Sequence, residues 1–203
     1  MMTRPFIAAS GAALFLAAAG LARSAAPPAA SAFKQAAPEV NACEFLTTAE
    51  VSSVLKTDVK PGERSDDGHT NVGSYSSTCF WRVNVPQGPD QGSPAAGARP
   101  MYAILNMMSW PAGSGMSGKF LQDFREAEKK DLIPEKTVPL KMGDEALSWG
   151  DGVAVRKGDL SFGVSVAFKP GDHKISGPMQ EALARKILEH LQHGERPGQS
   201  TGI

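Results

Sequence analysis

The sequence predicts an α+β fold, with an antiparallel sheet of about five strands, three helices packed on it and one disulfide bond. Segments with helical and with strand periodicity are grouped in the order helix, two strands, helix, three strands, helix, rather than strictly alternating. The clearest strand pair has the pattern of a hairpin, whose strands are antiparallel. Such grouping is typical of helices packed on an antiparallel sheet.

The first helix is predicted over residues 48–56, because a capping box stands at its start. Thr47 and Glu50 have the T-x-x-E spacing, in which the threonine hydroxyl accepts from the glutamate amide and the glutamate side chain reaches back. Apolar residues then recur on one side of this segment. Cys43 lies just ahead of the helix.

Two strands are predicted to follow this helix. Residues 78–85 alternate between apolar and polar side chains, as a half-buried strand does, and this places Cys79 on the core-facing side. Residues 101–110 are apolar enough for a central strand. Residues 61–77, ahead of both, are polar and contain several glycines, so we expect a loop there.

The second half repeats the order of a helix followed by strands. Apolar residues at helical spacing predict a helix over residues 117–132. Residues 136–140 predict a short strand, and residues 152–168 predict a hairpin that turns at residues 158–159. A final helix is predicted to begin at Pro178, since the fixed φ of proline suits the first helical position.

The N-terminus has the layout of a secretory signal peptide over residues 1–24, with a positive residue, an apolar run and a small-residue cleavage site. A transmembrane anchor is the alternative, but the run is short and lacks a charged stop-transfer cluster, so we expect no stable membrane span. The rest is predicted to form an Ala/Pro linker, a single α+β domain, a disordered loop within that domain, and a tail: residues 25–40, 41–193, about 86–100 and 194–203.

Export places the two cysteines in an oxidising compartment, either periplasmic or secreted, where one disulfide is their simplest use. The pair does not have the C-x-x-C spacing of a redox motif, and a zinc site would need further ligands. We therefore predict a disulfide between Cys43 and Cys79.

The charges of the chain are balanced. Lys and Arg together number 21, as do Asp and Glu, so the formal net charge is zero. Proteins that bind nucleic acid or an anionic membrane usually carry an excess of basic residues. We therefore expect no nucleic-acid partner.

Four segments combine into a recognisable pattern: CEFLTTAEVSSVLKTDV, the later CFW, GDEALSW, and VAVRKGDLSFGVSV. Together they resemble a group of small exported bacterial domains of unknown function. That group shows a C-x-L-L-T-x-x-E-V helix, a later cysteine before an aromatic strand, and a G-D-E-A segment followed by an R-K-G-D hairpin. The resemblance covers about residues 41–192 and implies a fold and an exported location, but no chemistry.

The segment GSGMSGK, residues 113–119, fits the G-x-x-x-x-G-K pattern of a phosphate-binding loop between a predicted strand and a predicted helix. The next residue is Phe120, whereas that motif needs Ser or Thr to hold Mg²⁺. We interpret the segment as a flexible loop before a helix, and we expect no cofactor.

Five side chains are candidates for a binding or metal site. Met107 and Trp110 could line a ligand-binding cleft, although methionine also fills gaps in hydrophobic cores. Arg156 flanks a hairpin turn, where it could hold an anion or lie in solvent. His190 and His193 are spaced i, i+3 on the final helix and could share a face as metal ligands. At the end of a helix, histidine also suits the helix dipole.

The leading hypothesis is an exported, non-catalytic domain that binds an envelope or protein partner, or a small apolar ligand. It depends on the export signal and on the absence of an assembled catalytic motif in the sequence. The alternative is an envelope hydrolase in which the fold brings His69 or His173 to a serine and a carboxylate. A third possibility is a purely structural interaction protein with a large exposed apolar patch.

Overall fold

The computed structural model describes residues 36–84, 102–133, 135–167 and 173–194, and for residues 173–175 it describes the backbone alone. The predicted signal peptide, most of the predicted linker, the predicted loop at about 86–100 and the predicted tail beyond residue 194 lie outside these ranges. The domain organisation of those segments therefore stays a prediction.

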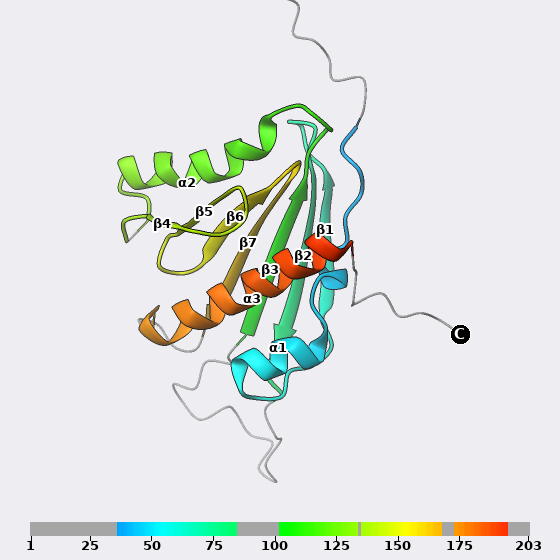
Figure 1. Cartoon of the computed structure of the whole chain (residues 1–203), viewed down its shortest axis with the longest axis vertical. Helices are drawn as coiled ribbons and strands as arrows, with labels where there is room; N and C mark the ends of the chain where they lie inside the picture. The colour runs from blue at the N-terminus through cyan, green and yellow to red at the C-terminus, as the bar shows by residue number, and fades with distance from the viewer. Residues whose placement is uncertain (1–35, 85–101, 134, 168–172, 195–203) are drawn as a thin grey trace, which may run out of the picture. The chain divides into compact units, whose positions relative to one another are not determined.

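The described residues form one antiparallel sheet of seven strands in the order β1-β2-β3-β7-β6-β5-β4 (Figure 1). The strands are β1 (Glu63–His69), β2 (Tyr75–Arg82), β3 (Tyr102–Ser109), β4 (Val138–Leu140), β5 (Glu145–Ser148), β6 (Val153–Lys157) and β7 (Leu160–Ala167). Strands β1 to β3 form one half of the sheet and strands β4 to β7 the other. The halves meet where β3 pairs with β7, with Ser109 opposite Leu160. The two halves of the chain are therefore joined in the middle of the sheet.

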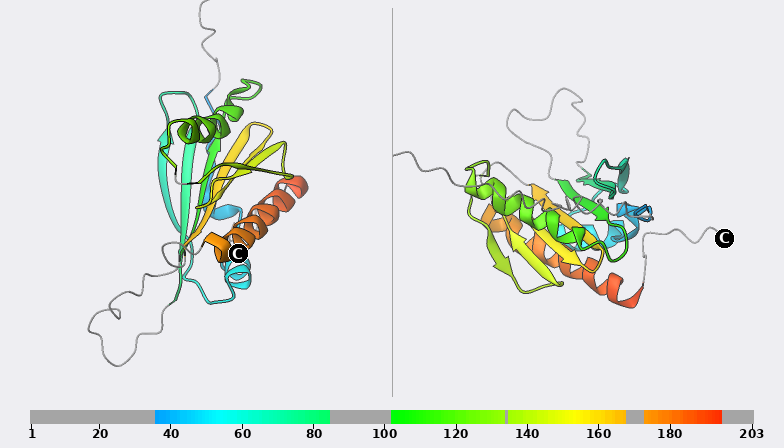
Figure 2. Two further views of the ribbon diagram at one scale, coloured as in Figure 1. Left: turned by 90° about the vertical axis from the view of Figure 1, so that its left-hand side faces the viewer. Right: turned by 90° about the horizontal axis from the view of Figure 1, so that it is seen from above.

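Helices pack on both faces of this sheet. They are the 3-10 turns η1 (Ala42–Glu44) and η2 (Met116–Gly118), and the helices α1 (Thr48–Leu55), α2 (Lys119–Lys129) and α3 (His173–His193). Seen from above, the sheet lies between α2 and α3 (Figure 2). Alternate residues of β6 follow this arrangement, since Ala154 packs with Leu121 of α2 while Val153 and Val155 belong to the cluster on the opposite face. No helix within the described ranges is long and apolar enough to cross a membrane.

The main hydrophobic core lies between the sheet and the helices α1 and α3. Its largest fully buried side chains include Trp81, Leu105, Met107, Phe162 and Leu183. Met107, a candidate ligand contact, is 0% exposed and packs inside this core.

The predicted disulfide between Cys43 and Cys79 is present. It ties the segment ahead of α1 to β2, and its sequence separation of 36 residues corresponds to a stabilisation of about 4 kcal/mol in the chain-entropy model. The predicted capping box also forms. The Thr47 hydroxyl accepts from the Glu50 amide at 3.1 Å, and the Glu50 carboxylate accepts from the Thr47 amide at 2.9 Å.

The expectation of about five strands is wrong, because the described part of the sheet has seven. The additional β1 falls within residues 61–77, where we expected a loop. This edge strand pairs only with β2, and its side chains are exposed or half-buried, so it has no apolar alternation. The additional β5 has four residues, too few for a clear periodic pattern.

Other expected boundaries also differ in the structure. The strand predicted over residues 78–85 is Tyr75–Arg82, and the helix predicted over 117–132 is Lys119–Lys129. The final helix begins at His173, so Pro178 lies inside it rather than at its start. Packing of the domain begins ahead of residue 41, because Ala37 and Val40 are only 3% and 5% exposed. These two residues lie in the segment that the sequence predicts as linker, and they extend the core towards the N-terminus.

Candidate functional site

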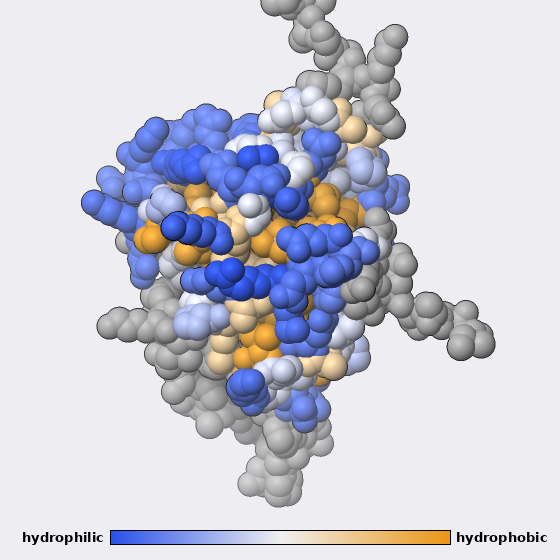
Figure 3. Space-filling model, in the orientation of Figure 1, coloured by the Kyte–Doolittle hydropathy of each residue, from blue (hydrophilic) through white to orange (hydrophobic). Residues whose placement is uncertain are grey.

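A pocket of about 360 Å³ opens where the end of α3 meets the ends of β3 and β7. We call it the α3-end pocket. The chain ahead of η1 forms the remaining wall. Hydrophobic surface is visible between the C-terminal end of α3 and the strand ends (Figure 3). A volume of about 300–1,000 Å³ is typical of pockets that hold small molecules.

The walls of the α3-end pocket are mainly apolar. The larger apolar side chains come from four separate segments: Val40, Phe45, Trp110, Leu160 and Leu191. The first three are 5%, 3% and 2% exposed, so they form rigid parts of the wall. Leu160 and Leu191 are half-buried and lie at the opening of the pocket.

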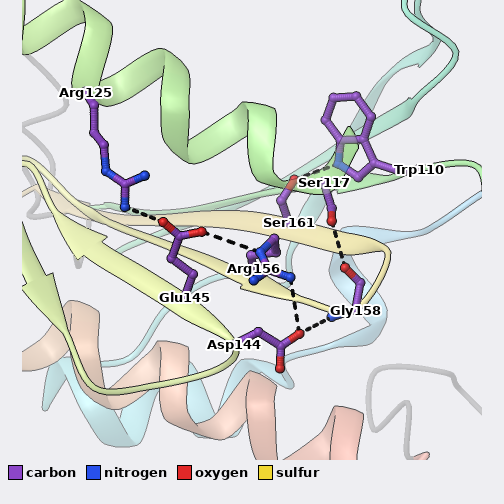
Figure 4. A network of polar contacts seen from close by, with 8 residues as sticks. All are labelled: Trp110, Ser117, Arg125, Asp144, Glu145, Arg156, Gly158 and Ser161. Carbon is purple, nitrogen blue, oxygen red and sulfur yellow. Dashed lines mark hydrogen bonds and ion pairs between the residues drawn. The ribbon is translucent and has the colours of Figure 1, made fainter. Parts of the chain in front are cut away.

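Trp110, a candidate from the sequence, is held firmly at this pocket. Its indole Nε1–H donates to the Ser161 hydroxyl at 2.9 Å, as Figure 4 shows. Its backbone amide donates to the carbonyl of Asp159 at 2.9 Å. The indole is therefore fixed from β7, and its N–H is already used within the protein.

The N-terminal wall is fastened to the sheet by polar contacts. The Ser109 hydroxyl at the end of β3 donates to the carbonyl of Pro38. The Ala42 amide donates to the Ser77 hydroxyl at 3.0 Å. Residues 38–40 therefore belong to the folded domain, and without them the pocket would be open on one side.

His190 also lines the pocket, and a carboxylate engages its ring. His190 Nε2 lies 2.9 Å from Glu50 Oε1, and Lys186 Nζ lies 3.7 Å from the same oxygen. Burial raises the pKa of Glu50, but hydrogen bonds from Thr47 and His190 outweigh it and hold that pKa below its ordinary value. This cluster joins α1 to α3 beside the pocket.

The other histidine of the pair, His193, is exposed and does not line the pocket. No group of three or more His, Cys, Asp or Glu side chains able to hold a metal ion occurs in the described ranges. The geometry therefore gives no support to a metal site at His190 and His193.

Arg156 does not line the pocket and belongs to a polar network (Figure 4). Its guanidinium is 3.6 Å from a carboxylate oxygen of Asp144 and 3.6 Å from one of Glu145. Arg125 of α2 pairs with Glu145 from the other side. Two acids thus surround the Arg156 side chain, which makes it a poor site for an anion.

The same network explains two motifs of the sequence. Asp144 accepts from the Gly158 amide at 2.7 Å and from Lys157 Nζ at 3.0 Å. These hydrogen bonds, that of Gly158 first, hold the pKa of Asp144 below its ordinary value. Gly143 has φ +60°, and a Cβ there would lie 2.6 Å from the Arg156 carbonyl oxygen. The G-D-E-A segment therefore braces the R-K-G-D turn, which is a role in folding.

The segment of residues 113–119 does not have the chemistry of a phosphate-binding loop. The Gly113 amide donates to the Asp159 carboxylate at 3.2 Å, and Lys119 pairs with Asp123 at 2.7 Å. The Gly113 amide and the Lys119 ammonium, which a phosphate would need, are therefore already bound to carboxylates. This supports the interpretation of the segment as a loop before a helix.

Of the two histidines of the hydrolase alternative, the structure describes the side chain of His69 and not that of His173. His69 packs edge-on against the ring of Tyr75, with centroids 5.1 Å apart, at the sheet edge. Within the described ranges, no hydrogen bond joins it to a serine and a carboxylate.

Comparison of the chain with protein-family models, curated proteins and solved structures found no significant match. The resemblance to exported bacterial domains therefore stays a prediction. Evidence for function comes from the geometry of this chain, and the α3-end pocket is its most developed feature.

Proposed function

We propose that this protein is an exported, non-catalytic binding domain, and that the α3-end pocket holds a small apolar ligand. The observation that carries this proposal is a pocket of about 360 Å³, walled by buried apolar side chains, with an indole fixed by its own hydrogen bond. Pockets of this size, largely apolar with a few polar groups, are the usual sites of small-molecule binding.

Binding is favoured over hydrolysis by the hydrogen bonding of the polar residues in the pocket. The Ser109 hydroxyl is 1% exposed and donates to a backbone carbonyl. His190 is engaged by Glu50. A serine nucleophile must instead give its proton to a histidine within hydrogen-bond reach. We therefore do not carry the hydrolase alternative further.

Export is supported by two independent features. The N-terminal pattern is that of a signal peptide, and the disulfide is the cross-link expected of an oxidising compartment. We place the protein in the periplasm or outside the cell, in agreement with the resemblance to exported domains.

The first test is the native mass of the protein exported from a bacterial host. Loss of about residues 1–24 is the result expected of export. A bound mass that disappears on denaturation would support the binding proposal and identify the ligand.

A second test uses the neutral fluorescent probe N-phenyl-1-naphthylamine. We expect the mature protein to bind it, and Leu191→Trp to weaken binding at least tenfold, because the larger side chain fills the pocket. Leu132→Trp is the matched control, since Leu132 is 72% exposed and outside the pocket. Unchanged binding in a folded Leu191→Trp variant, or no binding by the unmodified protein together with a bare native mass, would overturn the proposal.

A further inference from the structure

Two carboxylates line the α3-end pocket, besides His190 with its contact to Glu50. Glu39 and Asp159 both line it, and no lysine or arginine does. Glu39 is exposed and Asp159 is half-buried, so both lie towards the opening. The pocket thus combines apolar walls with carboxylates.

These two carboxylates lack a cationic partner among the described residues. Asp159 accepts from the Gly113 amide at 3.2 Å, and no ion pair involves Glu39 or Asp159 in that part of the chain. Asp144 differs, because it is paired with Lys157 and Arg156. A cationic ligand at the pocket would supply the partner that Glu39 and Asp159 lack among the described residues.

Three polar side chains of the pocket besides the two carboxylates already have hydrogen-bond partners within the protein. The Trp110 indole donates to Ser161, and the Ser109 hydroxyl donates to Pro38. His190 Nε2 is engaged with Glu50. An anionic ligand would need such donors, whereas a cationic ligand needs acceptors and aromatic surface.

Aromatic side chains form part of the wall of the same pocket. Phe45 and Trp110 both line it, and tryptophan is the side chain whose ring attracts cations most strongly. The Trp110 N–H already donates to Ser161, so this side chain brings no further donor for an anionic ligand.

We propose that the ligand of the α3-end pocket is an amphipathic cation, with a small apolar body and an ammonium group. The apolar part packs among Val40, Phe45 and Leu191, and the ammonium lies at the opening near Glu39 and Asp159. This inference rests on the proposed function, because it specifies the charge of the ligand that the same pocket binds.

The test compares three probes that share an octyl chain and differ in the charge of the head group. Octyltrimethylammonium, 1-octanol and octanoate are titrated into the mature full-length protein by calorimetry, at low salt and at 0.15 M salt. We expect the cation to bind about tenfold more tightly than the alcohol at low salt, and octanoate to bind most weakly. The preference should shrink at the higher salt, since both carboxylates are partly exposed.

Charge-removing variants locate the effect. Glu39→Gln and Asp159→Asn should each reduce the preference for the cation, while binding of 1-octanol stays unchanged and shows that the pocket is intact. Asp123→Asn is the matched control, because it removes one exposed carboxylate from α2, outside the pocket. It should leave all three affinities unchanged.

The outcomes separate the two proposals. Equal affinity for the cation and the alcohol would overturn the charge proposal and leave the binding function standing. A cation preference that survives in both Glu39→Gln and Asp159→Asn would overturn the assignment to these carboxylates. If none of the octyl probes and no N-phenyl-1-naphthylamine binds, and the native mass is bare, the proposed function itself is wrong.

Discussion

The two faces of the sheet are covered in different ways. On one face, α1 and α3 pack on a large buried cluster that the Cys43–Cys79 disulfide ties together. On the other, α2 packs on a cluster that has three buried members among the described residues, Leu121, Leu147 and Ala154. The aromatic side chains around this smaller cluster are half-buried, and Phe124 stacks on Trp149 with ring centroids 4.4 Å apart.

This difference indicates where the stability of the domain resides. Regions with few buried apolar contacts open locally at a lower free energy than the main core does. We therefore expect α2 to be the less stable layer, and the α1–α3 face to determine global unfolding. The α3-end pocket borders the more stable layer, which suits a preformed binding site.

A pair of leucine substitutions tests this difference in stability most directly and should have the largest effect. Leu105 in the main core and Leu121 under α2 are both 0% exposed. We expect Leu105→Ala to lower the free energy of unfolding by about 3–5 kcal/mol, and Leu121→Ala by about 2–3 kcal/mol, because the smaller cluster can collapse into the space. Urea unfolding measures both values. Equal losses would show that the two faces contribute alike.

A pair of glycine substitutions should give intermediate effects. A Cβ at position 62 would lie 2.6 Å from Cys79 Sγ, which the disulfide holds, and 2.8 Å from Trp81 Nε1. At position 152 it would lie 2.2 Å from the Trp149 ring, which is stacked on Phe124, and 2.7 Å from Ser165 Oγ. We expect both substitutions to cost about 1–3 kcal/mol, with the smaller loss at position 152, because the Trp149 ring is half-buried whereas the disulfide holds Cys79 Sγ. Thermal melts should rank them in this order, and the opposite order would contradict it.

The smallest expected effect is the loss of folding stability at acid pH. Glu50 and Asp144 have pKa values below their ordinary values in the folded state, so each adds stability above the pKa of the unfolded chain. This stability is lost as the pH falls below the ordinary value of 4.5 for Glu50, and of 3.8 for Asp144, towards the folded values. Both side chains are partly exposed, so each contribution should stay below about 1 kcal/mol.

Substitutions separate the two carboxylates. Glu50→Gln should reduce the loss of stability between pH 7 and pH 3 more than Asp144→Asn does, since Glu50 is less exposed, at 20% against 33%. Urea unfolding at the two pH values measures this. If Glu50→Gln leaves the loss of stability between pH 7 and pH 3 unchanged, Glu50 does not contribute to that loss.

Much of the fold could be predicted because it is encoded in local signals. The capping box at Thr47 and Glu50 fixed the start of α1, and the alternation around Cys79 indicated β2 and its inward face. Strand β1 gave no such signal, since an edge strand with exposed side chains reads as a polar loop. The start of α3 was placed too late because Pro178 lies inside the helix.

The pocket could be predicted only in fragments. Trp110 and His190 were candidates, but for separate reasons, as a ligand contact and a metal ligand. Phe45 and Leu191 have the apolar character of ordinary core residues, and Glu39 lies in a segment that resembles a linker. These positions are far apart in the sequence, and the pairing of β3 with β7 helps to bring them together. No single sequence motif therefore predicts the pocket.

That pairing also has a consequence for how fast the protein folds. Strands β4 to β7 follow one another through short turns, so they can assemble from local contacts. Strand β3 must instead pair with β7 across the whole intervening segment. The chain loses conformational entropy when this long loop closes, before the new contacts stabilise the pairing. We therefore expect formation of the β3–β7 ladder to limit the rate of refolding, and the α3-end pocket to appear only in that last step.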